Sequence, residues 1–73
     1  MKIDRKIAEI FKDKGLNKTL PYVDFRDVGP GREGRDKVLN AEIENGSLKL
    51  VMGIDMTDKF YKLTPEGRKA LKG

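Results

Sequence analysis

The sequence of 73 residues contains no cysteine, no histidine and no tryptophan. Without cysteine the chain can form no disulfide bond, no thiolate nucleophile and no cysteine-ligated zinc site. Without histidine it lacks the commonest general base and the commonest metal ligand of proteins. We therefore expect a protein that is not an enzyme and that carries neither a metal site nor a cofactor.

Long apolar runs are also absent from the sequence. No stretch approaches the roughly 18 apolar residues of a membrane span, and Met1–Asp4 does not open a signal peptide. Charged residues make up 38% of the chain and hydrophobic residues 37%, a polar composition that still permits a small core. We expect a single domain over residues 1–73, located in the cytoplasm and not bound to a membrane.

Both ends of the chain have helical patterns. Near the N-terminus, apolar residues recur at i, i+4, i+7 and i+8, as on one face of an amphipathic helix: Ile3, Ile7, Ile10 and Phe11. This spacing predicts a helix over residues 3–14. Near the C-terminus, Thr64 is a good helix cap and Pro65 suits the first helical residue, so a short helix is predicted there.

The segment before residue 36 is rich in glycine and proline. Residues 22–28 are consistent with a short strand that carries Val23 and Phe25 on one face. Residues 29–34 match the G-x-G-x-x-G pattern of dinucleotide-binding loops. In a dinucleotide-binding fold that loop opens a helix in a large doubly wound sheet, which 73 residues cannot form. We expect a flexible Gly-rich loop at residues 29–35 instead.

Residues 39–54 alternate between apolar and polar side chains on both sides of Asn45-Gly46. Asn-Gly between two alternating runs is typical of a two-residue β-hairpin turn, because that turn needs positive φ twice. Such a hairpin would place Ile43 opposite Leu48 and Glu42 opposite Lys49. The alternative is a helix over residues 35–45 with Gly46 as its cap, which would bring Glu42 near the apolar face. The pattern favours the hairpin.

A third antiparallel strand is predicted at residues 60–63, before the C-terminal helix. The predicted fold class is α+β: an N-terminal helix, a small antiparallel sheet of three or four strands containing the Asn-Gly hairpin, and a short C-terminal helix.

Positive charge is concentrated near the C-terminus. The whole chain has a net charge of +4, and residues 59–73 carry five cations against Glu66 alone. A basic excess of this kind attracts phosphate backbones. The candidate contacts for nucleic acid or another partner are Lys59, Lys62, Arg68, Lys69 and Lys72, extended from the Gly-rich loop by Arg32 and Arg35.

Residues 59–71 read Lys-Phe-Tyr-Lys-Leu-Thr-Pro-Glu-Gly-Arg-Lys-Ala-Leu. This segment resembles the end of the wing and the following helix of winged-helix transcription regulators, where the pattern Y-x-L-T-x-x-G-x-x-x-L is common. The resemblance implies that Lys59 and Lys62 contact DNA phosphates. A winged helix also needs two further helices before the wing, one of them a recognition helix, which the glycines and prolines of residues 16–36 oppose.

The leading hypothesis is a small non-enzymatic regulator of gene expression that binds nucleic acid through its basic terminal segments. The alternative is a protein-binding inhibitor or adaptor of phage type, which would bind an acidic surface of a transcription enzyme such as RNA polymerase. Mixed charge and a single small domain favour this alternative. A third possibility is an accessory subunit of a larger assembly.

Overall fold

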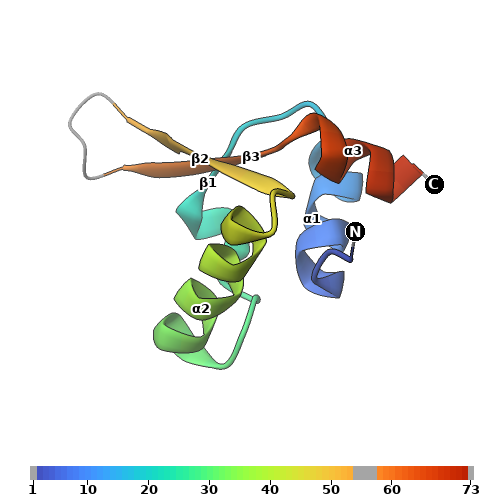
Figure 1. Cartoon of the computed structure of the whole chain (residues 1–73). Helices are drawn as coiled ribbons and strands as arrows, with labels where there is room; N and C mark the ends of the chain where they lie inside the picture. Colours follow the sequence, from blue (N-terminus) through green and yellow to red (C-terminus); the bar gives the residue numbers. More distant parts are fainter. Residues whose placement is uncertain (1, 54–57, 73) are drawn as a thin grey trace.

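The computed structural model describes residues 2–53 and 58–72 of the chain. The elements follow one another as α1 (Arg5–Lys14), β1 (Leu20–Pro21), the 3-10 helix η1 (Tyr22–Phe25), α2 (Gly31–Glu44), β2 (Leu48–Met52), β3 (Lys59–Leu63) and α3 (Pro65–Lys72). The fold class is α+β, and the antiparallel sheet has the strand order β1-β3-β2. In Figure 1 the β2–β3 ribbon extends to the left, with α2 below it and with α1 and α3 at the right.

The core lies on one face of the sheet, which we call the core face. Leu48 lies opposite Leu63 and Leu50 lies opposite Tyr61, so these side chains share that face. Helix α1 packs against it, and aromatic rings fill the centre, with Phe25 and Tyr61 in an edge-to-face contact at 5.4 Å between ring centroids. The buried cluster comprises Ile7, Phe11, Leu20, Phe25, Val28, Leu39, Leu48, Tyr61 and Leu63.

The predicted terminal helices are confirmed, each with a side-chain cap. Helix α1 begins at Arg5 because the Asp4 carboxylate accepts hydrogen bonds from the N–H groups of Lys6 and Ile7, at 3.0 and 3.2 Å. Helix α3 begins after Thr64, whose hydroxyl oxygen accepts a hydrogen bond of 3.0 Å from the N–H of Gly67. The strand predicted at residues 60–63 is also confirmed, as β3.

The predicted Asn45-Gly46 hairpin is wrong, because the residues before it belong to the continuous helix α2. Gly46 has a φ of +89° and terminates that helix. The N–H groups of Gly46 and Ser47 donate to the carbonyl oxygens of Ile43 and Glu42, at 3.2 and 3.0 Å. These two bonds are the pattern of a helix that ends in a left-handed glycine. Strand β2 consequently pairs with β3, and Leu48 does not face Ile43.

Two earlier expectations for residues 22–35 are also corrected. The segment predicted as a flexible loop at residues 29–35 is helical from Gly31 onward, since α2 starts there. Gly29 and Gly31 have φ angles of +72° and +79°, and they turn the chain sharply around Pro30 into the helix. The strand considered at residues 22–28 lies earlier, as β1, and η1 follows it with Phe25 buried.

A helix over residues 35–45 brings Glu42 near the apolar face, and this was the argument against that helix from the sequence. The Glu42 side chain is only 5% exposed, yet both carboxylate oxygens receive hydrogen bonds. The main-chain N–H of Asp4 donates to Oε2, and Nδ2 of Asn45 donates to Oε1 at 2.7 Å. The Ser47 hydroxyl lies 2.9 Å from the same Oε1. A buried carboxylate is tolerated when such donors replace water, so the helix forms.

The connection after α2 also positions α3. Ser47 is fully buried, and its carbonyl oxygen accepts a hydrogen bond of 3.0 Å from the N–H of Thr64. The Thr64 hydroxyl donates to the carbonyl oxygen of Gly46. Gly67 lies so close to this connection that a Cβ atom there would be 2.3 Å from the Ser47 carbonyl oxygen. Helix α3 can therefore approach Ser47 only through a residue without a side chain.

We predict that Gly67→Ala destabilises the protein by about 2 kcal/mol, because the added methyl group overpacks a rigid backbone contact. Helix propensity alone predicts the opposite sign, since alanine favours a helix over glycine by about 1 kcal/mol. Urea unfolding measures the difference. Lys69→Ala, an exposed change in the same helix, is the control and should stay within about 0.5 kcal/mol of wild type. A stabilised Gly67→Ala protein would contradict the contact.

Candidate nucleic-acid interface

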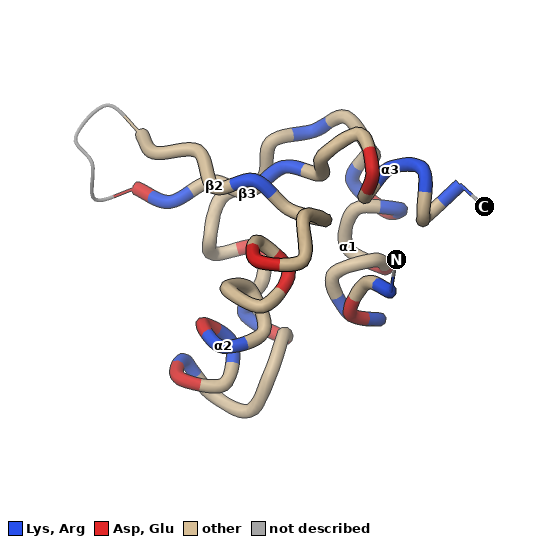
Figure 2. Tube along the Cα trace, in the orientation of Figure 1, with Lys and Arg blue, Asp and Glu red and all other residues tan. Residues whose placement is uncertain are grey.

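The face of the sheet opposite the core carries two lysines side by side. Lys49 of β2 lies directly opposite Lys62 of β3, and in the same way Val51 lies opposite Phe60. Directly opposite residues of antiparallel strands share a face, so these four side chains form what we call the outer sheet face. Lys49 is exposed and Lys62 is half-buried. Figure 2 shows the two basic segments next to each other at the centre of the ribbon.

The two opposed lysines have no compensating charge in the described structure. Among residues 2–53 and 58–72 the ion pair is Arg5–Glu9 in α1, with 3.6 Å between Nε and Oε1. Like charges directly opposite each other destabilise a sheet by up to about 1 kcal/mol. The outer sheet face thus presents an uncompensated pair of cations beside the apolar side chains of Val51 and Phe60.

Helix α3 supplies three further cations that the sequence nominated. Lys69 and Lys72 are exposed in its last turn. Arg68 is half-buried, and its Nη1 donates a hydrogen bond of 2.9 Å to the carbonyl oxygen of Leu63, the last residue of β3. Lys69 and Lys72 are therefore available to a partner, whereas Arg68 also fastens α3 to the sheet.

Lys59 and Lys62 lie on opposite faces of β3, because their positions differ by an odd number along one strand. Lys59 lies opposite Met52 and shares the core face of the ribbon, beyond the end of the packed core. Arg32, in the first turn of α2, lines the same cavity as Lys59. The structure thus brings Lys59 together with Arg32 and separates it from Lys62.

Arg35 is held inside the fold. Its Nη2 donates to the carbonyl oxygen of Arg26 at 2.7 Å, and its Nη1 donates to the Tyr22 hydroxyl at 3.4 Å. The guanidinium carbon lies 5.4 Å from the centroid of the Tyr22 ring, within cation–π range. Nε is buried, and no described atom accepts a hydrogen bond from it. Arg35 therefore positions η1 against α2, and its half-buried guanidinium is engaged by contacts within the protein.

Lys49 is the basic residue that the sequence reasoning missed. The predicted hairpin register placed Lys49 opposite Glu42, where the two charges would have compensated each other. The alternating run that begins at Leu48 belongs to a strand, but its partner is the following strand and not the preceding segment. Pairing this run with residues 59–63 would have placed Lys49 beside Lys62.

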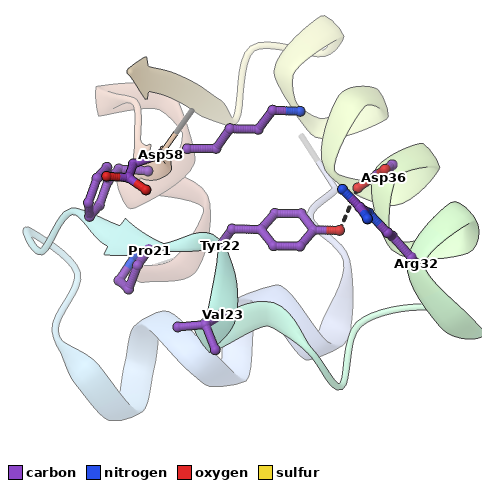
Figure 3. Close-up of a pocket in the computed structure, with 8 residues that line it drawn as sticks. Pro21, Tyr22, Val23, Arg32, Asp36 and Asp58 are labelled. Atoms are coloured by element: carbon purple, nitrogen blue, oxygen red, sulfur yellow. Dashed lines mark hydrogen bonds between the residues drawn. The ribbon is translucent and has the colours of Figure 1, made fainter. Parts of the chain in front are cut away.

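The cavity shared by Arg32 and Lys59 has a volume of about 340 Å³ and lies between η1, the first half of α2 and the start of β3. Figure 3 shows Tyr22 across its centre, with the hydroxyl pointing to Asp36. That hydroxyl donates to Oδ1 of Asp36 at 2.7 Å. Burial raises the pKa of nearby Tyr61 above its ordinary value, and the charge of Asp36 and the neighbouring Tyr22 raise it further.

Helix α2 itself is not basic. It carries three cations and four carboxylates, and among its exposed residues Glu33 and Glu44 accompany Arg32 and Lys37. The positive surface is therefore formed by the outer sheet face and α3.

No three or more acidic side chains of the described residues are grouped so that they could hold a metal ion. No helix in the described part of the chain has the length and apolar character needed to cross a membrane.

Comparisons with protein-family models, with curated proteins and with solved structures find no match. The functional interpretation therefore depends on the arrangement of the cations.

We predict that Arg35→Ala lowers the free energy of unfolding by about 2 kcal/mol, because it removes hydrogen bonds and the stacking on Tyr22. Arg32→Ala is the control, because Arg32 is exposed in the same helix three residues earlier, and it should change the free energy of unfolding by less than about 0.5 kcal/mol. Urea unfolding of both variants measures the effect. If the Arg35→Ala and Arg32→Ala variants had equal free energies of unfolding, the contacts of Arg35 would not stabilise the fold, and the prediction would be wrong.

Proposed function

We propose that this chain is a small, non-enzymatic, cytoplasmic regulator of gene expression that binds nucleic acid through the outer sheet face and α3. The observation that carries the proposal is the Lys49–Lys62 pair. Two lysines opposite each other cost stability, and within residues 2–53 and 58–72 no carboxylate forms an ion pair with either one. A polyanionic partner such as a phosphate backbone converts this repulsion into a favourable contact.

The resemblance to winged-helix regulators adds support. It requires a helix directly before the wing, and α2 ends at Glu44 shortly before β2 starts at Leu48. In this proposal the β2–β3 ribbon corresponds to the wing, and α3 corresponds to the helix that follows the wing. The two-residue strand β1 and the single turn η1 stand where a further α-helix would be expected, which is a departure from the pattern.

The chemistry of the surface determines what it can recognise. Lysines on the outer sheet face and on α3 contact phosphates as point charges, and such contacts position a protein without reading sequence. Helix α2, with its four carboxylates, offers no comparable surface to a phosphate backbone. The proposed binding is thus driven by charge and has little sequence specificity.

The test is a double variant, Lys49→Ala with Lys62→Ala, titrated with random duplex DNA at several salt concentrations. We expect weaker binding to all sequences alike. The slope of log affinity against log salt should fall by about 1.8, roughly 0.9 for each phosphate contact removed. The same variant should be as stable as wild type or more stable, by up to about 1 kcal/mol, because the repulsion is removed.

The matched control is Lys6→Ala with Lys12→Ala. Both lysines are exposed on α1, the helix that packs on the core face, so the control removes the same charge from the other side of the sheet. DNA binding that both double variants weaken equally would contradict a specific role for the outer sheet face. Dissociation constants weaker than about 10⁻⁴ M at low salt would remove the nucleic-acid proposal.

A second candidate function is binding to a protein, such as the acidic surface of a transcription enzyme. It is favoured by Leu50 and Met52, which are 37% and 44% exposed on the edge strand β2. A protein complex anchored by these side chains would depend on them strongly and on salt only modestly. The salt titration therefore separates the two candidates.

A further inference from the structure

The cavity between η1, α2 and β3 lies where the sheet is incomplete. Strand β1 ends at Pro21, opposite Phe60, so Lys59 has a strand neighbour in β2 but none in β1. The chain then turns into η1, and the space beside the start of β3 remains open as the cavity of about 340 Å³. This volume is within the range of sites that bind small molecules.

One part of the cavity wall is apolar and suits a flat ring. It is formed by Pro21, Val23 and Phe60, with the Tyr22 ring between them. Val23 is 60% exposed, so much of its apolar side chain is open to a ligand in the cavity. The Tyr22 ring is fixed in place, because its hydroxyl donates to Asp36 and Arg35 stacks on it. Aromatic bases stack on such rigid platforms.

The other part of the wall is charged. Arg32 comes from α2 and Lys59 from β3, and neither forms an ion pair with any residue in the described ranges. Asp58 also lines the cavity, and its carboxylate can accept hydrogen bonds from an amino group. Asp36 already accepts from Tyr22. Figure 3 shows Arg32 and Asp58 at opposite ends of the cavity, with Tyr22 between them.

These features together define the ligand. Two cations on facing elements suit a phosphate group, the apolar wall suits a planar ring, and Asp58 suits an exocyclic amine on that ring. We infer that the cavity binds one nucleotide that carries an exocyclic amino group, with its phosphate between Arg32 and Lys59. The nucleotide comes either free from solution or unpaired from a nucleic-acid strand. The cavity shares Phe60 with the outer sheet face, but neither Lys49 nor Lys62 lines it, so the inference does not depend on the proposed function.

The direct test titrates the full chain with adenosine monophosphate and follows backbone amide chemical shifts. We expect saturable shifts confined to residues 22, 23, 32 and 58–60. Adenosine and inorganic phosphate, each titrated alone, should bind about tenfold more weakly, because each lacks one half of the contacts. The double variant Arg32→Ala with Lys59→Ala should lose about tenfold in affinity for the monophosphate.

The matched control is Lys6→Ala with Lys12→Ala, which removes two exposed cations from α1 and should leave the affinity for the monophosphate unchanged. Unchanged amide positions outside the cavity show that each variant is folded. Absence of saturable shifts in wild type, or equal losses in both double variants, would overturn the inference. The Lys49→Ala, Lys62→Ala variant should retain nucleotide binding even where it loses duplex binding.

Two further arms distinguish the sources of the nucleotide. One uses duplex DNA with a single unpaired adenine, and the other uses the same duplex without it. Tighter binding to the bulged duplex that disappears in the Arg32→Ala, Lys59→Ala variant would assign the site to an unpaired nucleotide of a strand. Equal binding to both duplexes, with binding of the free monophosphate, would assign it to a nucleotide from solution. Either result supports the inferred ligand chemistry.

Discussion

The carboxylate of Glu42 lies where three segments of the chain meet, and the arrangement of the helices depends on its hydrogen bonds. It accepts from the main chain of Asp4 just before α1, from Asn45 at the end of α2 and from Ser47 before β2. A carboxylate buried without such donors would cost several kcal/mol and would not remain in the core. One side chain thereby fixes the start of α1, the end of α2 and the entry into the sheet.

The rest of the molecule follows from where α2 ends. Because Gly46 and Ser47 terminate the helix in a fixed geometry, β2 leaves in the direction that pairs it with β3. This register opposes Lys49 to Lys62 on one face and leaves Lys59 on the other. The same helix carries Arg32 at its first turn to the cavity beside β3. The same pairing of β2 with β3 therefore positions the lysines of both candidate binding surfaces.

The sequence allowed prediction of the elements whose signals are local. The apolar stripe of α1, the Thr64-Pro65 start of α3 and the strand at residues 60–63 could all be predicted without tertiary information. The Asn45-Gly46 pair could not, because positive φ at a glycine serves a hairpin turn and a helix end equally well. What decides between them is whether Glu42 can be buried, and that depends on Asp4, 38 residues away.

The candidate site was predictable only in part, for the same reason. Lys62, Lys69 and Lys72 were identified from local charge, and the structure leaves them accessible to a partner. Lys49 was missed because its neighbour depends on the strand register. The contacts that hold Arg35 depend on η1, where a strand had been considered. Charged residues can be counted along a sequence, but which of them lie opposite each other across a sheet is known only when the strand pairing is known.

The most direct test of the role of Glu42 compares Glu42→Gln with Glu44→Gln. The two variants make the same chemical change, one buried and one exposed in the same helix. In Glu42→Gln an amide NH₂ faces donors, so we expect a loss of about 2 kcal/mol in urea unfolding and faster hydrogen exchange at the Asp4 amide. Glu44→Gln should stay within about 0.5 kcal/mol of wild type. Equal stabilities, with the Asp4 amide equally protected in both variants, would contradict the account.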